Sequence, residues 1–266
     1  MPDNRGLLNI WHRFMTSEVK ILLIFIIVMG VGIGFSAEPF LSFSEAGSLP
    51  ADSIDQPLPS ANVEEQQKRL DESPQRFLFF GDSMLEGLMR RFGDYAAENG
   101  HEVNVVLWYS SSTERWATTR VLEQYMQKYR PTYVVICLGS NELFVRDLPK
   151  REQYVADIVG RLDSVPFVWI SPPNWRKDTG INDIIIKHVG QSRFFDSRRL
   201  TLERGSDHMH PTMRAGAQWM DSVAVWMSSK LTAHPVRMNF PKVKKQPKSI
   251  KLLPPEYDGK EGRGDK

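Results

Sequence analysis

The chain has 266 residues, of which 41% are hydrophobic and 25% are charged, and its formal net charge is +2. This composition is ordinary for a globular protein, so wholesale disorder is excluded, and the net charge is too small to indicate a nucleic-acid partner. The length suits one well-packed domain with extensions, or two small domains.

The N-terminal region combines a basic flank with an apolar run. Residues 1–20 carry three Lys or Arg side chains, and residues 21–37 are uncharged and mostly apolar. This pattern is typical of a secretory signal or a signal-anchor. Phe35 stands where a small residue would precede a cleavage site, so we favour an uncleaved transmembrane anchor at 21–37. Residues 1–20 would then be cytoplasmic, and the rest of the chain would lie outside the cytoplasm.

Two charged segments flank the central region. Residues 38–74 contain eight Asp or Glu against two basic residues, which predicts a solvated acidic tether. Residues 235–266 contain nine Lys or Arg, four Asp or Glu and five prolines. We expect a basic tail there that is disordered or loosely docked. One interpretation is contact with anionic glycan, lipid headgroups or a partner; the one we favour is a tail that is simply solvated. The folded domain is then expected at 75–234.

The region 75–234 alternates strand-like and helix-like segments. The predicted strands are 76–80, 102–108, 133–138, 167–170 and a shorter one at 193–196. The predicted helices are 84–99, 114–129, 151–162 and 211–231. Near-continuous apolar strands that alternate with helices predict an α/β fold, with a parallel sheet covered on both faces. Ligands bind such sheets beyond the carboxyl ends of the strands.

The single cysteine, Cys137, lies within the third predicted strand. An intramolecular disulfide is therefore impossible, and a zinc site built on thiolates is not expected. We interpret Cys137 as a small buried hydrophobic residue.

The first candidate motif consists of Gly81, Asp82 and Ser83, where the first strand turns into a helix. A serine in this position exposes its hydroxyl at the sheet edge, and the helix N-terminus offers free N–H donors for a developing oxyanion. The same residues also suit a purely structural role, because Asp and Ser are good helix N-caps.

The second motif follows the third strand and contains Gly139 and Asn141. Glycine allows a close approach of the backbone, and the asparagine side chain can donate an N–H to an oxyanion. An ordinary strand-to-helix turn would explain the same residues.

The third motif, Asp207 to His210, comes just before the last predicted helix. An Asp three residues before a His can accept a hydrogen bond from one ring nitrogen, which leaves the other nitrogen free to take a proton from a serine. Pro211 would fit the first turn of the helix. The alternatives are a polar capping loop, or a metal site formed by Asp207, His208 and His210.

Together, in this order, the three motifs resemble the SGNH (GDSL-like) hydrolase superfamily over residues 76–232. The resemblance implies a flavodoxin-like three-layer α/β/α sandwich of about five parallel strands, and hydrolysis or transfer of an acyl ester. It assigns Ser83 as the nucleophile, His210 as the general base and Asp207 as the residue that orients the base. It also assigns the Asn141 side chain and the Ser83 amide as oxyanion donors.

Two positions depart from the pattern of this superfamily. The glycine that usually follows the second strand is missing, and we expect the backbone N–H of Ser111 to take its place in the oxyanion hole. The residue after the asparagine is Glu142 rather than Asp, for which we expect a surface role or an indirect supporting one.

These observations predict a serine-dependent esterase or O-acyltransferase that needs no metal or organic cofactor. The basic and apolar N-terminal segment predicts a bacterial inner-membrane protein with a periplasmic domain. We expect this domain to act on acylated polysaccharide, and a membrane-bound acyl donor would be a further partner. Four aromatic residues near the motifs would stack on sugars or simply pack in the core: Trp108, Tyr109, Trp116 and Trp175. Two other hypotheses remain open. One is a metal-dependent phosphoesterase that uses Asp82 as well, and the other is a catalytically silent glycan-binding or assembly protein.

Overall fold

The computed structural model of the chain describes residues 69–259. The predicted cytoplasmic segment and anchor, most of the predicted tether and residues 260–266 lie outside the described residues. No helix within 69–259 is long and apolar enough to cross a membrane.

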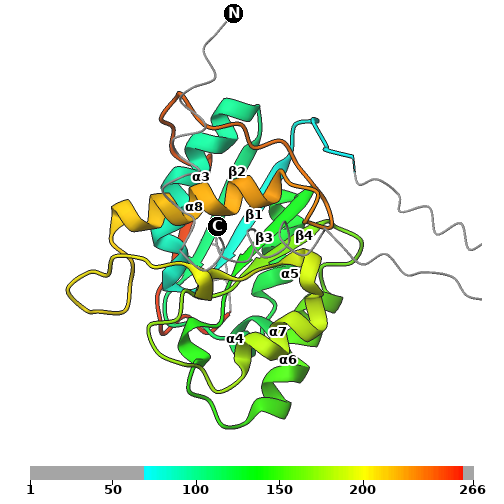
Figure 1. Cartoon of the computed structure of the whole chain (residues 1–266). Coiled ribbons are helices and arrows are strands. Elements are labelled where there is room, and N and C mark those ends of the chain that lie inside the picture. The colour runs from blue at the N-terminus through cyan, green and yellow to red at the C-terminus, as the bar shows by residue number, and fades with distance from the viewer. Residues whose placement is uncertain (1–68, 260–266) are drawn as a thin grey trace, which may run out of the picture. The chain divides into compact units, whose positions relative to one another are not determined.

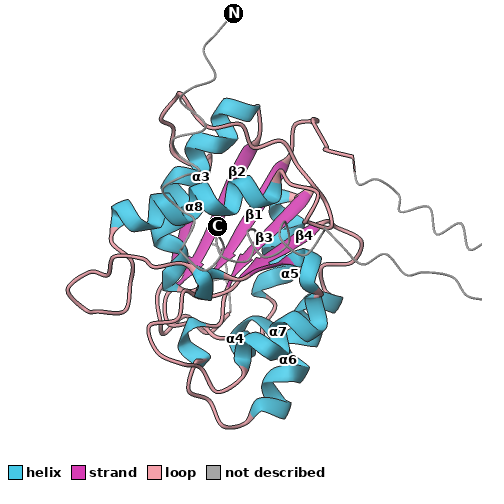
Figure 2. Ribbon diagram, viewed as in Figure 1, coloured by secondary structure: helices cyan, strands magenta, loops and turns pink. Residues whose placement is uncertain are grey.

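A six-stranded, entirely parallel sheet forms the centre of the fold. Its strands are β1 (Arg76–Gly81), β2 (Glu102–Trp108), β3 (Tyr133–Cys137), β4 (Phe167–Ile170), β5 (Phe194–Phe195) and β6 (Ser249–Leu253). The spatial order is β5-β4-β3-β1-β2-β6. Figure 2 shows the strands lying between helices. The predicted α/β fold is confirmed, and the architecture is consistent with a flavodoxin-like three-layer sandwich, with one strand more than expected.

Helices cover both faces of the sheet (Figure 1). One face packs against α3 (Glu86–Asn99) and α8 (Met213–Met227). The other face packs against α4 (Thr113–Thr118), α5 (Val121–Tyr129), α6 (Leu148–Gly160) and α7 (Ile181–Val189). Side chains alternate along a strand, so Phe77 and Phe79 face α3 and α8 while Leu78 and Phe80 face the other layer. Cys137 is fully buried, as predicted.

Helices α3 and α8 approach each other closely at two glycines. A Cβ atom built on Gly216 would lie 2.4 Å from the carbonyl oxygen of Gly87, so no larger residue fits without moving a helix. The crossing lies near the start of both helices. It therefore brings the turn before α3, which carries Ser83, close to the loop before α8, which carries His210.

The helix predicted at 114–129 is in fact two helices, α4 and α5. Thr119 has an extended backbone that interrupts the helical path. The Arg161 guanidinium donates to the carbonyls of Ala117 and Thr119, which satisfies backbone acceptors where α4 ends. A further helix, α7, forms where no element was predicted. It contains three consecutive isoleucines, which favour strands when judged by local preference alone.

The expectation of a solvated tail is wrong for residues 235–259. Strand β6 pairs with β2 along its length, and Leu253 is buried. The segment before β6 crosses α3, where the backbone N–H of Lys245 donates to Asp94 at 2.8 Å. After β6, the carbonyl of Pro254 accepts from the indole N–H of Trp108 at 3.1 Å. The folded domain therefore extends well beyond the boundary predicted at 234.

Candidate active site

The candidate nucleophile lies where β1 ends. A Cβ atom on Gly81 would lie 1.7 Å from the carbonyl oxygen of Cys137, so only glycine allows β1 and β3 to pass this closely. The N–H of Asp82 then donates to the same carbonyl at 3.0 Å. Ser83 follows as the first residue of a short 3-10 helix that leads into α3. The local sequence therefore places the Ser83 hydroxyl at the carboxyl edge of the sheet.

Asp82 ties this turn to the turn after β3. Its side chain is fully buried and accepts the backbone N–H groups of Met84 at 3.0 Å, Gly139 at 3.1 Å and Ser140 at 3.0 Å. Burial raises the pKa of Asp82, and these hydrogen bonds act in the opposite direction. The capping role considered for Asp82 is thus observed. The carboxylate serves to hold the first and second motifs together.

Ser83, His210 and Asp207 form a hydrogen-bonded series. The Ser83 Oγ lies 2.8 Å from His210 Nε2, and His210 Nδ1 lies 2.6 Å from an Asp207 carboxylate oxygen. The hydrogen bond with His210 is the main cause that holds the pKa of Asp207 below its usual value, so this carboxylate is ionised and only accepts. Nδ1 must then carry the proton of a neutral imidazole. Nε2 is left as an acceptor that faces the serine hydroxyl.

The loop before α8 holds the imidazole in place through its backbone. The Asp207 carboxylate also accepts the N–H groups of Met209 at 2.9 Å and His210 at 3.0 Å. The His210 carbonyl accepts the N–H of Gly205 at 2.8 Å. Thr212, rather than His208 or His210, caps α8 through its side chain. Pro211 therefore lies just before the helix and not in its first turn.

His208 takes no part in this hydrogen-bonded series. Its backbone is left-handed, with φ at 59°, its side chain is exposed, and its N–H donates to the carbonyl of Gly205. Within residues 69–259, no group of three or more His, Cys, Asp or Glu side chains is arranged to hold a metal ion. In the described part of the chain, the metal-dependent hypothesis therefore lacks a set of ligands.

Two of the three predicted oxyanion donors are available. The Ser83 N–H has no acceptor among the described residues. The Asn141 side-chain nitrogen donates one N–H to the carbonyl of Ser111 at 2.9 Å, which fixes the amide and leaves its second N–H for a ligand. The Ser111 N–H, in contrast, donates to the carbonyl of Trp108 at 3.2 Å in a tight turn. The prediction that this N–H faces an oxyanion is therefore not met in this structure.

Glu142 connects the turn after β3 to the turn after β2. Its carboxylate accepts both the N–H and the hydroxyl of Thr113, at 2.8 and 2.6 Å, and lies 3.4 Å from the Arg151 guanidinium. The side chain is only 1% exposed, and burial raises its pKa. The surface role considered for Glu142 is therefore wrong, and the indirect supporting role fits. Sequence reasoning missed Thr113 and Arg151, because nothing local marks partners that are 29 and 9 residues away.

The site is open to solvent. The side chains of His210 and Asp207 are 40% and 41% exposed. Three exposed apolar side chains lie within three residues of Asn141 or His210 in the sequence: Phe144, Met209 and Met213. Trp108 and Trp116 are fully buried, so neither stacks on a ligand. Such an open arrangement suits a bulky or polymeric substrate better than a small, enclosed one.

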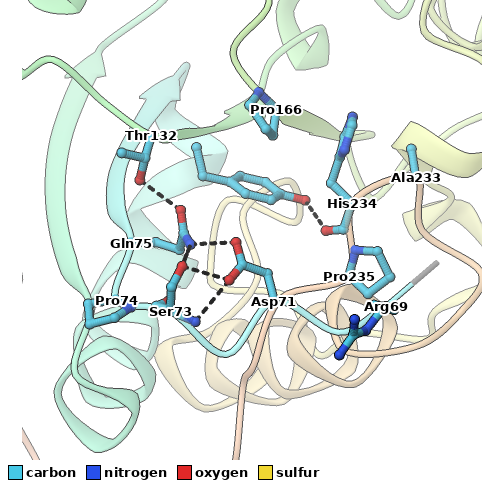
Figure 3. A pocket seen from close by; sticks show the side chains of 11 residues that line it. Arg69, Asp71, Ser73, Pro74, Gln75, Thr132, Pro166, Ala233, His234 and Pro235 are labelled. Carbon is cyan, nitrogen blue, oxygen red and sulfur yellow. Dashed lines mark hydrogen bonds between the residues drawn. The ribbon is translucent and has the colours of Figure 1, made fainter.

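A cavity of about 500 Å³ lies elsewhere, beside residues that precede β1, β3 and β4 (Figure 3). Its polar side chains are bonded to one another: Gln75 donates to Asp71 at 2.9 Å and accepts from Thr132 at 2.7 Å. The Tyr133 hydroxyl donates to the carbonyl of His234 at 3.0 Å. This cavity lies at the opposite edge of the sheet from Ser83, and its hydrogen bonds connect Asp71 and Gln75, which precede β1, to Thr132, which precedes β3.

No protein-family model matches this sequence, and no curated protein matches it. The class of site therefore rests on the fold and the side chains themselves. They define an α/β protein with a Ser–His–Asp hydrogen-bonded series at the carboxyl edge of a parallel sheet.

Proposed function

We propose that this chain is a serine-dependent esterase or O-acyltransferase of the SGNH (GDSL-like) hydrolase superfamily. The observation that carries the proposal is the continuous hydrogen bonding from Asp207 through His210 to Ser83, with distances of 2.6 and 2.8 Å. Three residues in this order are what nucleophilic acyl transfer requires: a nucleophile, a base within hydrogen-bonding reach, and a group that orients the base.

The reaction proceeds in two steps. His210 Nε2 takes the proton of Ser83 as the serine oxygen attacks the ester carbonyl, and the carbonyl π electrons move to the oxygen. Collapse of the tetrahedral intermediate expels the alcohol, which His210 protonates, and leaves an acyl-serine. Water or a sugar hydroxyl then attacks the acyl-serine with the same base, and Ser83 is released with its proton restored.

The developing oxyanion requires N–H donors that are already in place. The N–H of Ser83 and the free side-chain N–H of Asn141 fill this role in the proposal. The hydrogen bond from Asn141 to Ser111 supports it, because a side chain that is already held loses little entropy when it binds the oxyanion.

The proposed substrate is an acyl ester, most simply an acetyl ester, of a cell-envelope or exported polysaccharide. Support comes from the open site and from the apolar segment at 21–37, which predicts an anchor in the inner membrane with the domain on its outer side. A transferase in this location would take its acyl group from a membrane-bound donor partner. No metal or organic cofactor takes part in the proposed steps.

Turnover of 4-nitrophenyl acetate by the full chain in detergent tests the proposal. We expect hydrolysis that Ser83→Ala abolishes and that a metal chelator leaves unchanged. Loss of activity with the chelator, restored by added metal, would instead support the phosphoesterase hypothesis. Equal rates for the wild type and Ser83→Ala would contradict a serine nucleophile.

A further inference from the structure

A second cavity lies at the carboxyl edge of the sheet, on the loop that follows β4. It measures about 400 Å³, and its lining includes Asn174, Trp175, Arg176, Lys177 and Arg198. Because this loop and the Ser83 turn both follow carboxyl ends of parallel strands, the cavity lies on the same edge as the reacting groups.

Hydrogen bonds join this loop to the catalytic loop. The guanidinium of Arg204 donates to the carbonyl of Met209, next to His210, and to the carbonyl of Pro173, both at 2.6 Å. One arginine therefore bridges the loop that carries the general base and the loop that lines the cavity.

The cavity also borders the loop that carries Asn141. The ring of Trp175 packs edge-on against Phe144, with the ring centroids 6.1 Å apart. Phe144 comes three residues after Asn141 and is 50% exposed. Exposed aromatic surfaces of this kind pack against the apolar faces of sugar rings.

The charged side chains that line the cavity differ in whether they have bonding partners. Asp178 accepts from the side chain of Asn182 at 3.0 Å and from the N–H of Gly180 at 2.9 Å, and Asp183 pairs with Arg198 at 3.6 Å. Arg176 and Lys177 are exposed, and neither forms an ion pair within residues 69–259. Two cations are thus free for a ligand, whereas Asp178 is hydrogen-bonded and Asp183, which is 79% exposed, shares Arg198 with Asp196.

We infer that this cavity is a subsite for a carboxylated sugar of the glycan that carries the acyl ester. The planar Arg176 guanidinium matches a sugar carboxylate in a two-pronged hydrogen bond, Lys177 adds a second positive charge, and the Trp175–Phe144 pair supplies the apolar contact. The inference deepens the proposed function and rests on it for the reaction, but not for the binding. The substrate class that it names is an acidic, uronate-containing polysaccharide.

Binding of an oligogalacturonide and of its carboxyl-reduced, neutral counterpart to the full chain in detergent tests this subsite. We expect the charged oligomer to bind at least about tenfold more tightly, and added salt to reduce the difference. The double variant Arg176→Gln/Lys177→Gln should abolish the preference while 4-nitrophenyl acetate turnover stays at the wild-type level. The matched control Lys230→Gln/Lys244→Gln removes two exposed cations elsewhere and should retain the preference.

Equal affinity for the two oligomers would overturn the subsite, and so would a preference that survives Arg176→Gln/Lys177→Gln. A preference that both double variants lose would show only general charge attraction, which also overturns it. Failure of 4-nitrophenyl acetate turnover, with the preference intact in the wild type, would instead reject the proposed esterase and leave the subsite standing.

Discussion

Glu142→Gln tests whether the turn after β2 acts on catalysis through Asn141. The carboxylate accepts two hydrogen bonds from Thr113 and is 1% exposed. Glutamine has the same shape, but its amide nitrogen replaces one acceptor and meets a donor, either Thr113 or the Arg151 guanidinium. Loss of one charge-assisted hydrogen bond in a buried site costs roughly 1.5–3 kcal/mol.

Part of that free-energy cost should appear as a lower kcat. Thr113 lies two residues after Ser111, whose carbonyl holds the Asn141 side chain at 2.9 Å. Removing an oxyanion donor outright lowers kcat by roughly 10²–10³-fold, which sets the upper limit for an indirect effect. We therefore expect Glu142→Gln to lower kcat by about tenfold with little change in KM, because the ground-state ester gains less from these donors.

The assay is steady-state turnover of 4-nitrophenyl acetate by the wild type, Glu142→Gln, Asn141→Ala and the double variant. If Glu142 acts through Asn141, adding Glu142→Gln to Asn141→Ala should change kcat by less than about twofold. Thr113→Ser keeps both hydrogen bonds and should retain wild-type kcat. Losses that simply multiply in the double variant would refute this reasoning and leave Glu142 a general stabilising residue.

Four further predictions follow from the site and the fold. His210→Ala should lower turnover by roughly 10³-fold or more, as loss of a triad base does, whereas His208→Ala should have little effect; equal losses would favour a metal site. Asn141→Ala alone should lower kcat by roughly 10²–10³-fold at nearly constant KM. Ser111→Gly should lower the free energy of unfolding, measured by denaturant titration, by about 1–3 kcal/mol, because the Ser111 hydroxyl accepts a buried indole N–H at 3.0 Å. Truncation after Pro235 should lower the Tm by roughly 10 °C or more, since β6 and the buried Leu253 are lost, whereas an unchanged Tm would show that the tail adds no stability.

The parts of the fold that could be predicted are those with a strong local signal. Strands β1 to β4 are nearly continuous apolar runs, and their predicted bounds lie within one residue of the observed ones. The motif Asp207 to His210 also has a local cause, because a spacing of three residues lets the carboxylate fold back on the ring and on the backbone of the same loop. Interactions between residues of one short segment can therefore be predicted from the sequence.

What could not be predicted depends on partners that are distant in sequence. Strand β6 has three apolar residues between prolines in a lysine-rich segment, and it is stabilised by β2, about 145 positions earlier. The loss of glycine leaves a backbone donor at Ser111, so the sequence predicts this N–H in the oxyanion hole. Whether that N–H faces a ligand depends on the turn that Trp108 closes, and no side-chain pattern reveals it.

The most direct test of the central claim is the intact mass of the full chain after brief incubation with 4-nitrophenyl acetate, followed by peptide mapping. The account predicts one added acetyl group on Ser83, absent from Ser83→Ala and formed far more slowly in His210→Ala. Hydrolysis without any covalent adduct in rapidly quenched samples, or an acetyl group on another residue that persists in Ser83→Ala, would contradict the account.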